Sequence, residues 1–216
     1  MKRNVILILG ILCATLTVTH GQYEQAMGKN IPAVFASSDP SSLQDVINQL
    51  NRISAAETDK WEPYYYTAFG YLRMSGMVES NDEKDQYLDL TLETIAKADD
   101  VAPNHSELET LRGYAQMMKI TIDPGTRGMV YSGQAFASFQ KAIQLNPNNP
   151  RAHYLMGRMQ FGTAQFMGGG NEEACNTLSN ALRIFEEGEK PSNPLAPTWG
   201  MNSTQEAIQQ ICSQGE

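Results

Sequence analysis

Residues that could support catalysis or metal binding are few in this sequence, and they are scattered. Past residue 21 the only histidines are His105 and His153, on different expected elements, with no histidine–cysteine cluster near either. A nucleophile needs an adjacent base, and a metal ion needs several ligands at defined spacing. We expect His105 to be solvated in a turn and His153 to pack within the fold. The sequence therefore predicts no enzyme, no catalytic residue, no metal site and no cofactor.

Two short stretches could bind ions, and both have a simpler interpretation. Residues 168–171 read Gly-Gly-Gly-Asn ahead of an expected helix, whose free N–H groups could face an anion. They lack the Lys and Ser/Thr of a phosphate-binding loop, so we interpret them as a flexible loop with an Asn cap. Asp82, Glu83 and Asp85 fit an acidic first helical turn better than a calcium loop.

The elements that must position any site are helices. Apolar residues recur at helical spacing over 61–77, 83–101, 107–122, 129–145, 151–166 and 172–187, and no stretch alternates as a strand would. Sequences typical of a capping box stand at 41–44, 59–62, 80–83, 106–109 and 203–206. Residues 22–40 show no sustained period. We predict an all-α protein in which 22–40 is an irregular N-terminal segment.

Three glycines give the chain an internal repeat. Gly70, Gly113 and Gly157 lie inside expected helices, 43 and 44 residues apart. Glycine inside a helix costs about 1 kcal/mol relative to alanine, so its recurrence needs a reason such as close helix packing. The spacing predicts three helix-pair units at about 61–104, 105–149 and 150–188.

The second helix of the middle unit carries a family resemblance. Ala135, Phe139, Ala142 and Pro147 match the small, aromatic, small and terminal proline residues of a tetratricopeptide repeat (TPR). The chain thus resembles an exported bacterial TPR-like protein. The resemblance implies a right-handed superhelix of antiparallel helix pairs over 41–216, with a covering helix at each end, the last at 203–214. The usual unit has about 34 residues, and we expect the excess in loops around 123–128 and 162–171.

In TPR solenoids the first helix of each unit lines a concave groove. Aligning the three glycines carries the groove positions onto six residues suited to partner binding: Tyr64, Tyr71, Tyr114, Arg151, Tyr154 and Arg158. Aromatic and arginine side chains combine contact area with directed hydrogen bonds. The alternative is that these rings are covered by the chain itself, since Tyr64 is the first of three consecutive tyrosines that cannot all face one way.

The resemblance favours a non-enzymatic adaptor that holds a peptide or protein, such as a component of the cell envelope. Arg151 and Arg158 would pair with acidic or carboxyl-terminal groups of that partner. A different class remains open, namely a module that binds a small ligand or glycan on the same aromatic groove, because aromatic rings also stack on sugars. The sequence does not separate the two, and it predicts no oligomeric state.

The N-terminus predicts export. Lys2 and Arg3 precede an apolar run over residues 5–18 that is short for a membrane span, and Gly21 suits cleavage just before Gln22. We predict a signal peptide at 1–21 and a periplasmic or secreted protein with no membrane insertion after its removal. The net charge of −8, without a basic cluster, excludes nucleic acid and anionic membranes as partners.

Export bears on the two remaining cysteines, Cys175 and Cys212. In an oxidising compartment they could form a disulfide that ties the last helix to the third unit. They could equally be two small buried thiols, because a pair of cysteines does not prove a bond.

Overall fold

The computed structural model describes residues 14–188 and 193–213, which contain nine helices and no strand. The helices are α1 (Ala14–Ala36), α2 (Pro40–Ala56), α3 (Glu62–Ser75), α4 (Asn81–Val101), α5 (Ser106–Ile122), α6 (Pro124–Leu145), α7 (Pro150–Met167), α8 (Glu172–Glu186) and α9 (Met201–Cys212). The expected signal peptide lies partly outside this range, since residues 1–13 are not described. Within the described residues, every helix is too short or too polar to cross a lipid bilayer.

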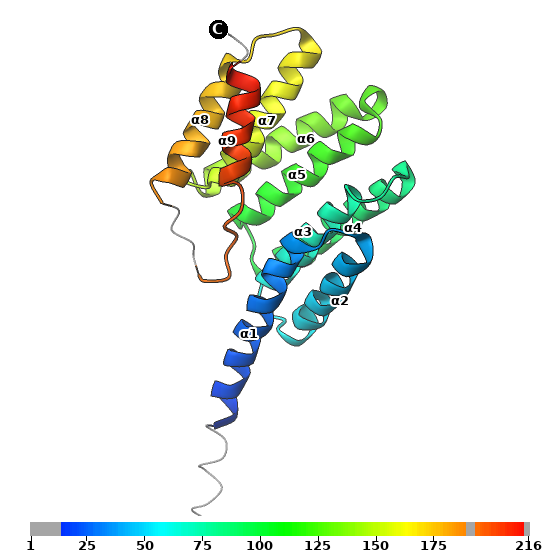
Figure 1. Ribbon diagram of the computed structural model, residues 1–216, viewed down its shortest axis with the longest axis vertical. Coiled ribbons are helices and arrows are strands. Elements are labelled where there is room, and N and C mark those ends of the chain that lie inside the picture. The colour runs from blue at the N-terminus through cyan, green and yellow to red at the C-terminus, as the bar shows by residue number, and fades with distance from the viewer. Residues whose placement is uncertain (1–13, 189–192, 214–216) are drawn as a thin grey trace, which may run out of the picture.

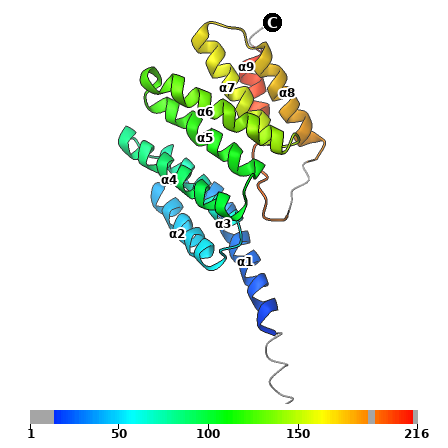
Figure 2. The ribbon, with the colours of Figure 1, turned by 180° about the vertical axis from the view of Figure 1, so that it is seen from behind.

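The helices form a stack of antiparallel pairs. Figures 1 and 2 show α3/α4, α5/α6 and α7/α8 following one another, with α2 before the first pair and α9 against the last. α1 packs along α2 and α3, and its N-terminal end projects from the body. The predicted all-α, TPR-like architecture of three pairs with covering helices is confirmed.

The three repeat glycines lie where two helices touch. A Cβ added at Gly70 would lie 2.7 Å from Cγ1 of Ile47, and one added at Gly157 would lie 2.8 Å from Cγ of Leu178. At Gly113 the corresponding distance to Cε1 of Phe139 is 2.5 Å. Real Cβ atoms do not approach so closely, so glycine allows α3 to pack on α2, α5 on α6 and α7 on α8 at this distance.

The helices begin close to the predicted capping sequences, and Ser80 stands at the N-cap of α4 as predicted, but the side chains that form capping hydrogen bonds are other residues. The Asp39 carboxylate accepts a hydrogen bond from the Ser42 amide at the start of α2, 2.9 Å away. Asp123 caps α6 and Asn149 caps α7 in the same way. The predicted cap serine Ser106 instead lies inside α5. An aspartate or asparagine before proline marks all three starts, since each of these helices opens with proline.

The prediction of an irregular segment over 22–40 is wrong, because α1 is helical to Ala36. Its buried side chains are Tyr23, Met27, Asn30 and Val34, which follow one helical face. Two of the four are polar or amphipathic, so the stripe does not stand out as apolar. Pro32 inside the helix further masked the pattern.

The excess length of the repeats is helix, not loop. Only Asp123 separates α5 from α6, and α7 continues to Met167. The predicted loops around 123–128 and 162–171 are therefore wrong, except for the turn at residues 168–171. Glycines at 125, 128 and 162 suggested loops, but here they are helical residues. As a result, α6 and α7 project beyond the length of a standard unit.

After α8 the chain returns to the first helix pair through residues 193–200, here called the strap. The Tyr66 hydroxyl donates to the carbonyl of Leu195, and Nδ2 of Asn193 donates to a carboxylate oxygen of Glu62. α9 then packs on α7 and α8, near the predicted position of the last helix. A disulfide joins Cys175 in α8 to Cys212 in α9, so of the two alternatives for these cysteines the structure has the bond.

Candidate functional site

Two of the six predicted groove residues lie away from the others. The hydroxyl of Tyr64 donates to the carbonyl of Ser54, so this ring faces α2. Tyr71 also faces α2, where its hydroxyl accepts from Asn51, and it stacks on Tyr87 of α4. Both rings fill contacts between helices, which was the alternative that the sequence left open.

Arg151 lies on the concave side but is already engaged. Its guanidinium makes a bidentate ion pair with Glu107, with Nε–Oε2 and Nη2–Oε1 distances of 2.9 and 2.8 Å. Arg151 is 1 % exposed, and Glu107 is also buried. Removing one partner of a buried ion pair strongly destabilises the folded protein, because the other charge is left buried and unpaired. Arg151 therefore joins α5 to α7 and is not presented to a partner.

The strap occupies the middle of the concave side. The Trp199 indole lies 5.2 Å from the Phe69 ring and 6.4 Å from the Tyr114 ring, centroid to centroid. Its Nε1 donates to the Tyr65 hydroxyl, 2.9 Å away, and the Arg151 guanidinium lies over its face. One indole thus contacts α3, α5 and α7, and this part of the groove is filled by the chain itself.

Sequence reasoning missed Tyr65, Phe69 and Trp199 as groove residues. On α3 the residues that face the groove are Tyr65 and Phe69, not the carried-over Tyr64 and Tyr71. Burial keeps the pKa of Tyr65 well above its usual value, and the nearby Glu107 carboxylate acts in the same direction. A signal existed in the three consecutive tyrosines, but nothing in the sequence around Trp199 indicates that it returns to the first unit.

Of the three remaining predicted residues, Tyr154 and Arg158 lie together beyond the strap. Nη1 of Arg158 donates to the Tyr154 hydroxyl, 3.1 Å away. Tyr114 lies between this pair and Trp199, and its pKa is raised by burial and by the neighbouring Tyr154. Four predicted residues, Tyr114, Arg151, Tyr154 and Arg158, thus share one region, and only Arg158 of them lines an open pocket.

That pocket, of about 540 Å³, lies between α5, α6 and α7. Its walls are mainly apolar and include four methionines, one phenylalanine and one cation. The full lining is Met117, Ile120, Thr121, Pro124, Gly125, Gly128, Met129, Ser132, Arg158, Met159, Gly162, Thr163, Phe166 and Met167. Half of these residues belong to the parts of α6 and α7 that the sequence had assigned to loops, so the added helical length builds much of the pocket.

Large apolar side chains at the pocket are exposed to solvent. Met129 is 90 % exposed, Phe166 84 % and Met167 76 %, and Val130 beside them is 58 % exposed. Exposed apolar groups gathered around a cavity are typical of a binding site, whereas scattered ones need no explanation. Methionine is common on such surfaces because its side chain adapts to different shapes.

Glycines in the pocket walls differ from the repeat glycines. A Cβ added at Gly128 of α6 or at Gly162 of α7 would meet no heavy atom within 4 Å. No packing contact therefore requires glycine at either position, although each lies inside a helix. The space beside both backbones opens into the pocket.

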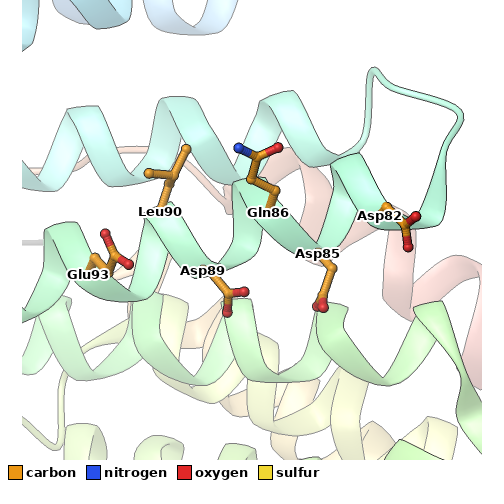
Figure 3. Close-up of a pocket in the computed structure, with 6 residues that line it drawn as sticks. All are labelled: Asp82, Asp85, Gln86, Asp89, Leu90 and Glu93. Atoms are coloured by element: carbon orange, nitrogen blue, oxygen red, sulfur yellow. The ribbon is translucent and has the colours of Figure 1, made fainter.

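A second hollow, of about 380 Å³, lies along α4 and is lined mainly by acidic groups. Figure 3 shows Asp85 and Asp89 pointing toward the neighbouring helix, while Asp82 and Glu93 lie at the two ends. Nζ of Lys119 in α5 is bonded to both Asp85 and Asp89. The carboxylates of Asp85 and Asp89 are therefore paired within the fold, and the two ion pairs join α4 to α5.

The histidines have structural surroundings. His105 stacks on Trp61 with ring centroids 4.0 Å apart, and burial lowers its pKa, so the expectation of a solvated side chain is wrong. Nε2 of His153 lies 2.9 Å from the Pro147 carbonyl oxygen, at the turn before α7. In the described part of the chain, no three His, Cys, Asp or Glu side chains are placed to hold a metal ion.

Comparison with solved structures identifies the class of fold to which this chain is similar. No family model matches the sequence, and no curated protein matches it either. Among solved structures, HusA, a haemophore from Porphyromonas gingivalis, superposes with a TM-score of 0.78 at 24 % identity, covering 90 % of this chain and 94 % of that one. A TPR protein of Thermus thermophilus, TTC0263, gives 0.60 at 15 % identity, covering 96 % and 97 %. The chain therefore has the fold of a bacterial TPR-like protein.

Proposed function

We propose that this chain is a non-catalytic binding protein that holds a flat, largely apolar small molecule in the α5–α6–α7 pocket. The observation that carries the proposal is the pair Gly128 and Gly162. Each glycine inside a helix costs about 1 kcal/mol of stability relative to alanine, and no contact within the protein requires it. Glycine at these positions leaves room for a flat ligand to lie directly against both helix backbones.

A haem-type tetrapyrrole is the first ligand to test. The pocket volume of about 540 Å³ lies within the usual range for small-molecule sites, and the walls are apolar. A tetrapyrrole has a flat apolar body that suits the space between the two glycines. The structural likeness to HusA supports this choice, because that protein is a haemophore.

A second role is favoured by the strap. The concave groove already holds the strap, a non-helical segment of this chain, through backbone carbonyls and an indole. The same surface suits the role predicted from the sequence, an adaptor that holds a peptide or cell-envelope protein, if the partner displaces the strap. We also propose that the protein acts in the periplasm or outside the cell, where the Cys175–Cys212 disulfide would persist.

The replacement Gly162→Leu tests the pocket directly. The leucine side chain would fill the space beside α7, and leucine favours a helix, so the fold should keep its stability or gain up to about 1 kcal/mol. We expect wild-type protein to bind haem in an absorbance titration, and the variant to bind at least about tenfold more weakly. Urea denaturation of both proteins without ligand checks the stability.

The matched control is Gly133→Leu, on the exposed side of α6 and outside the pocket. It should leave haem affinity unchanged. Wild-type affinity in the Gly162→Leu protein would move the site elsewhere. If wild-type protein binds neither haem nor metal-free porphyrin, the ligand class is wrong and the adaptor role is preferred.

A further inference from the structure

We infer that the ligand carries a carboxylate and that Arg158 binds it. The inference rests on the proposed function and adds the chemistry of one end of the ligand. It follows from the few polar groups that line the pocket.

Among the residues that the structure describes, Arg158 is the only cationic one that lines the pocket. Four arginines of the described chain are paired with carboxylates, namely Arg112, Arg127, Arg151 and Arg183, and Arg73 donates instead to the backbone carbonyls of Val34 and Ser37. In the part of the chain that the structure describes, no carboxylate lies within ion-pair distance of Arg158. This is notable in a chain with a net charge of −8, where acidic partners outnumber basic ones. An exposed guanidinium at an apolar wall is therefore available to an anion from outside the chain.

The hydroxyl groups of the pocket cannot serve the same purpose. Thr163 donates to the carbonyl of Met159, Thr121 to that of Met118, and Ser132 to that of Met129. Each hydroxyl has one proton, so all three are used within their own helices. They present only oxygen lone pairs to the pocket.

The N-terminus of α6 is also occupied. Its free N–H groups could attract an anion, but the Asp123 carboxylate already caps them and accepts from the Thr126 amide. Arg158 is thus the one side chain around the pocket with hydrogen-bond donors left for a ligand. A ligand group that accepts hydrogen bonds from a side chain of the pocket would therefore lie at Arg158.

Tyr154 positions the guanidinium. One Nη1–H of Arg158 is directed to the Tyr154 hydroxyl, and Tyr154 is itself buried. A guanidinium has five donors, so four remain. Two of them can bind both oxygens of a carboxylate side by side, which is the strongest and most directional pairing of this group.

The spacing along α7 gives the shape of the ligand. Arg158, Gly162 and Phe166 are four residues apart and share one face of the helix. Eight residues of helix rise about 12 Å from Arg158 to the exposed ring of Phe166. The carboxylate would lie at the Arg158 end, and the apolar body would extend past the glycine toward Phe166.

The test compares an acid with its ester. Protoporphyrin IX carries two carboxylates, and its dimethyl ester has the same ring without charge. We expect the wild-type protein to bind the diacid at least about tenfold more tightly than the ester, because an ionised partner strengthens a hydrogen bond. Arg158→Leu should weaken diacid binding by about the same factor and leave ester binding within about twofold. Arg158→Lys should retain part of the preference.

Arg183→Leu is the matched control, since Arg183 is an exposed arginine paired with Glu187 outside the pocket. It should keep the full preference for the diacid. Retained ester binding in Arg158→Leu shows that the pocket is intact. If wild-type protein binds acid and ester equally, this inference is overturned while the proposed function stands. If it binds neither, the proposed function falls and the inference with it.

Discussion

At the scale of the residue, glycine has two opposite roles in this chain. Gly70, Gly113 and Gly157 allow two helices to touch, whereas Gly128 and Gly162 leave space beside a helix. Only the first role was readable from the sequence, because equal spacing marks a repeat. The second depends on what lies opposite each glycine, and that is known only once the helices are placed.

Replacement by alanine should have opposite effects on the free energy of unfolding at the two kinds of glycine. Gly113→Ala should lower the free energy of unfolding by about 1–3 kcal/mol, because its Cβ would overlap the fully buried ring of Phe139. Gly162→Ala in α7, where an added Cβ would meet no heavy atom within 4 Å, should raise it by up to about 1 kcal/mol through helix propensity. Urea denaturation of both variants measures the difference. Equal effects at the two sites would contradict the packing argument.

At the scale of the element, an ion-pair network holds the start of α6 in place. Asp85 of α4 accepts from Lys119 of α5 and, through both of its oxygens, from Arg127 in the first turns of α6. Lys119 is 2 % exposed, so this network is partly shielded from water. It fixes the end of α6 that carries the glycine wall of the pocket.

Asp85→Asn should show this stabilisation through its pH dependence. Hydrogen bonding from Arg127, followed by Lys119, lowers the pKa of Asp85 to about 2. A carboxyl with a lowered pKa in the folded state stabilises the fold above its unfolded pKa, near 4, and the effect is lost as pH falls toward 2. We expect the variant to be about 1–2 kcal/mol less stable at pH 7.

The difference between the two proteins should narrow between pH 4 and pH 2, as followed by chemical denaturation at several pH values. Asp82→Asn on the exposed start of the same helix is the control and should have little effect at any pH. A difference that stays constant down to pH 2 would rule out the charge of Asp85 as its cause.

Sequence patterns predicted most of the elements but not their ends. Apolar periodicity located α2 to α9, since each buries a regular stripe. It failed for α1, whose buried face includes Asn30 and Tyr23, and for the start of α6 and the end of α7, where glycine suggested loops. Those two ends line the pocket. Their sequence has the weakest helical pattern of the site, and the sequence analysis therefore missed them.

At the scale of the whole molecule, the strap makes the solenoid a closed structure. Trp199 lies 134 residues from Tyr65 in sequence, yet the two side chains are hydrogen-bonded. Local periodicity carries no information about such a contact, which explains why the sequence left open whether the groove is exposed or covered by the chain itself. The fold was predictable because its repeats contact their neighbours; the closure was not, because it joins the first unit to the last.

Trp199→Ala tests how much the strap contributes. Removing a half-buried indole that touches three helices should lower the free energy of unfolding by about 2 kcal/mol, somewhat less than for a fully buried tryptophan. The neighbouring exposed residue provides a control, Thr198→Ala, which should be close to neutral. Guanidinium denaturation compares the two. Wild-type stability in Trp199→Ala would mean that backbone hydrogen bonds alone hold the strap.

The same indole also limits how this chain can change over evolution. Open solenoids grow or shrink by duplicating or deleting a unit, because each unit contacts only its neighbours. Here α3, α5 and α7 each contribute a contact to one side chain. An extra helix pair between them would move the outer helices apart by about 20 Å, at 8–10 Å per helix, beyond the reach of a tryptophan. The strap therefore excludes the insertion of a further helix pair between α3 and α7.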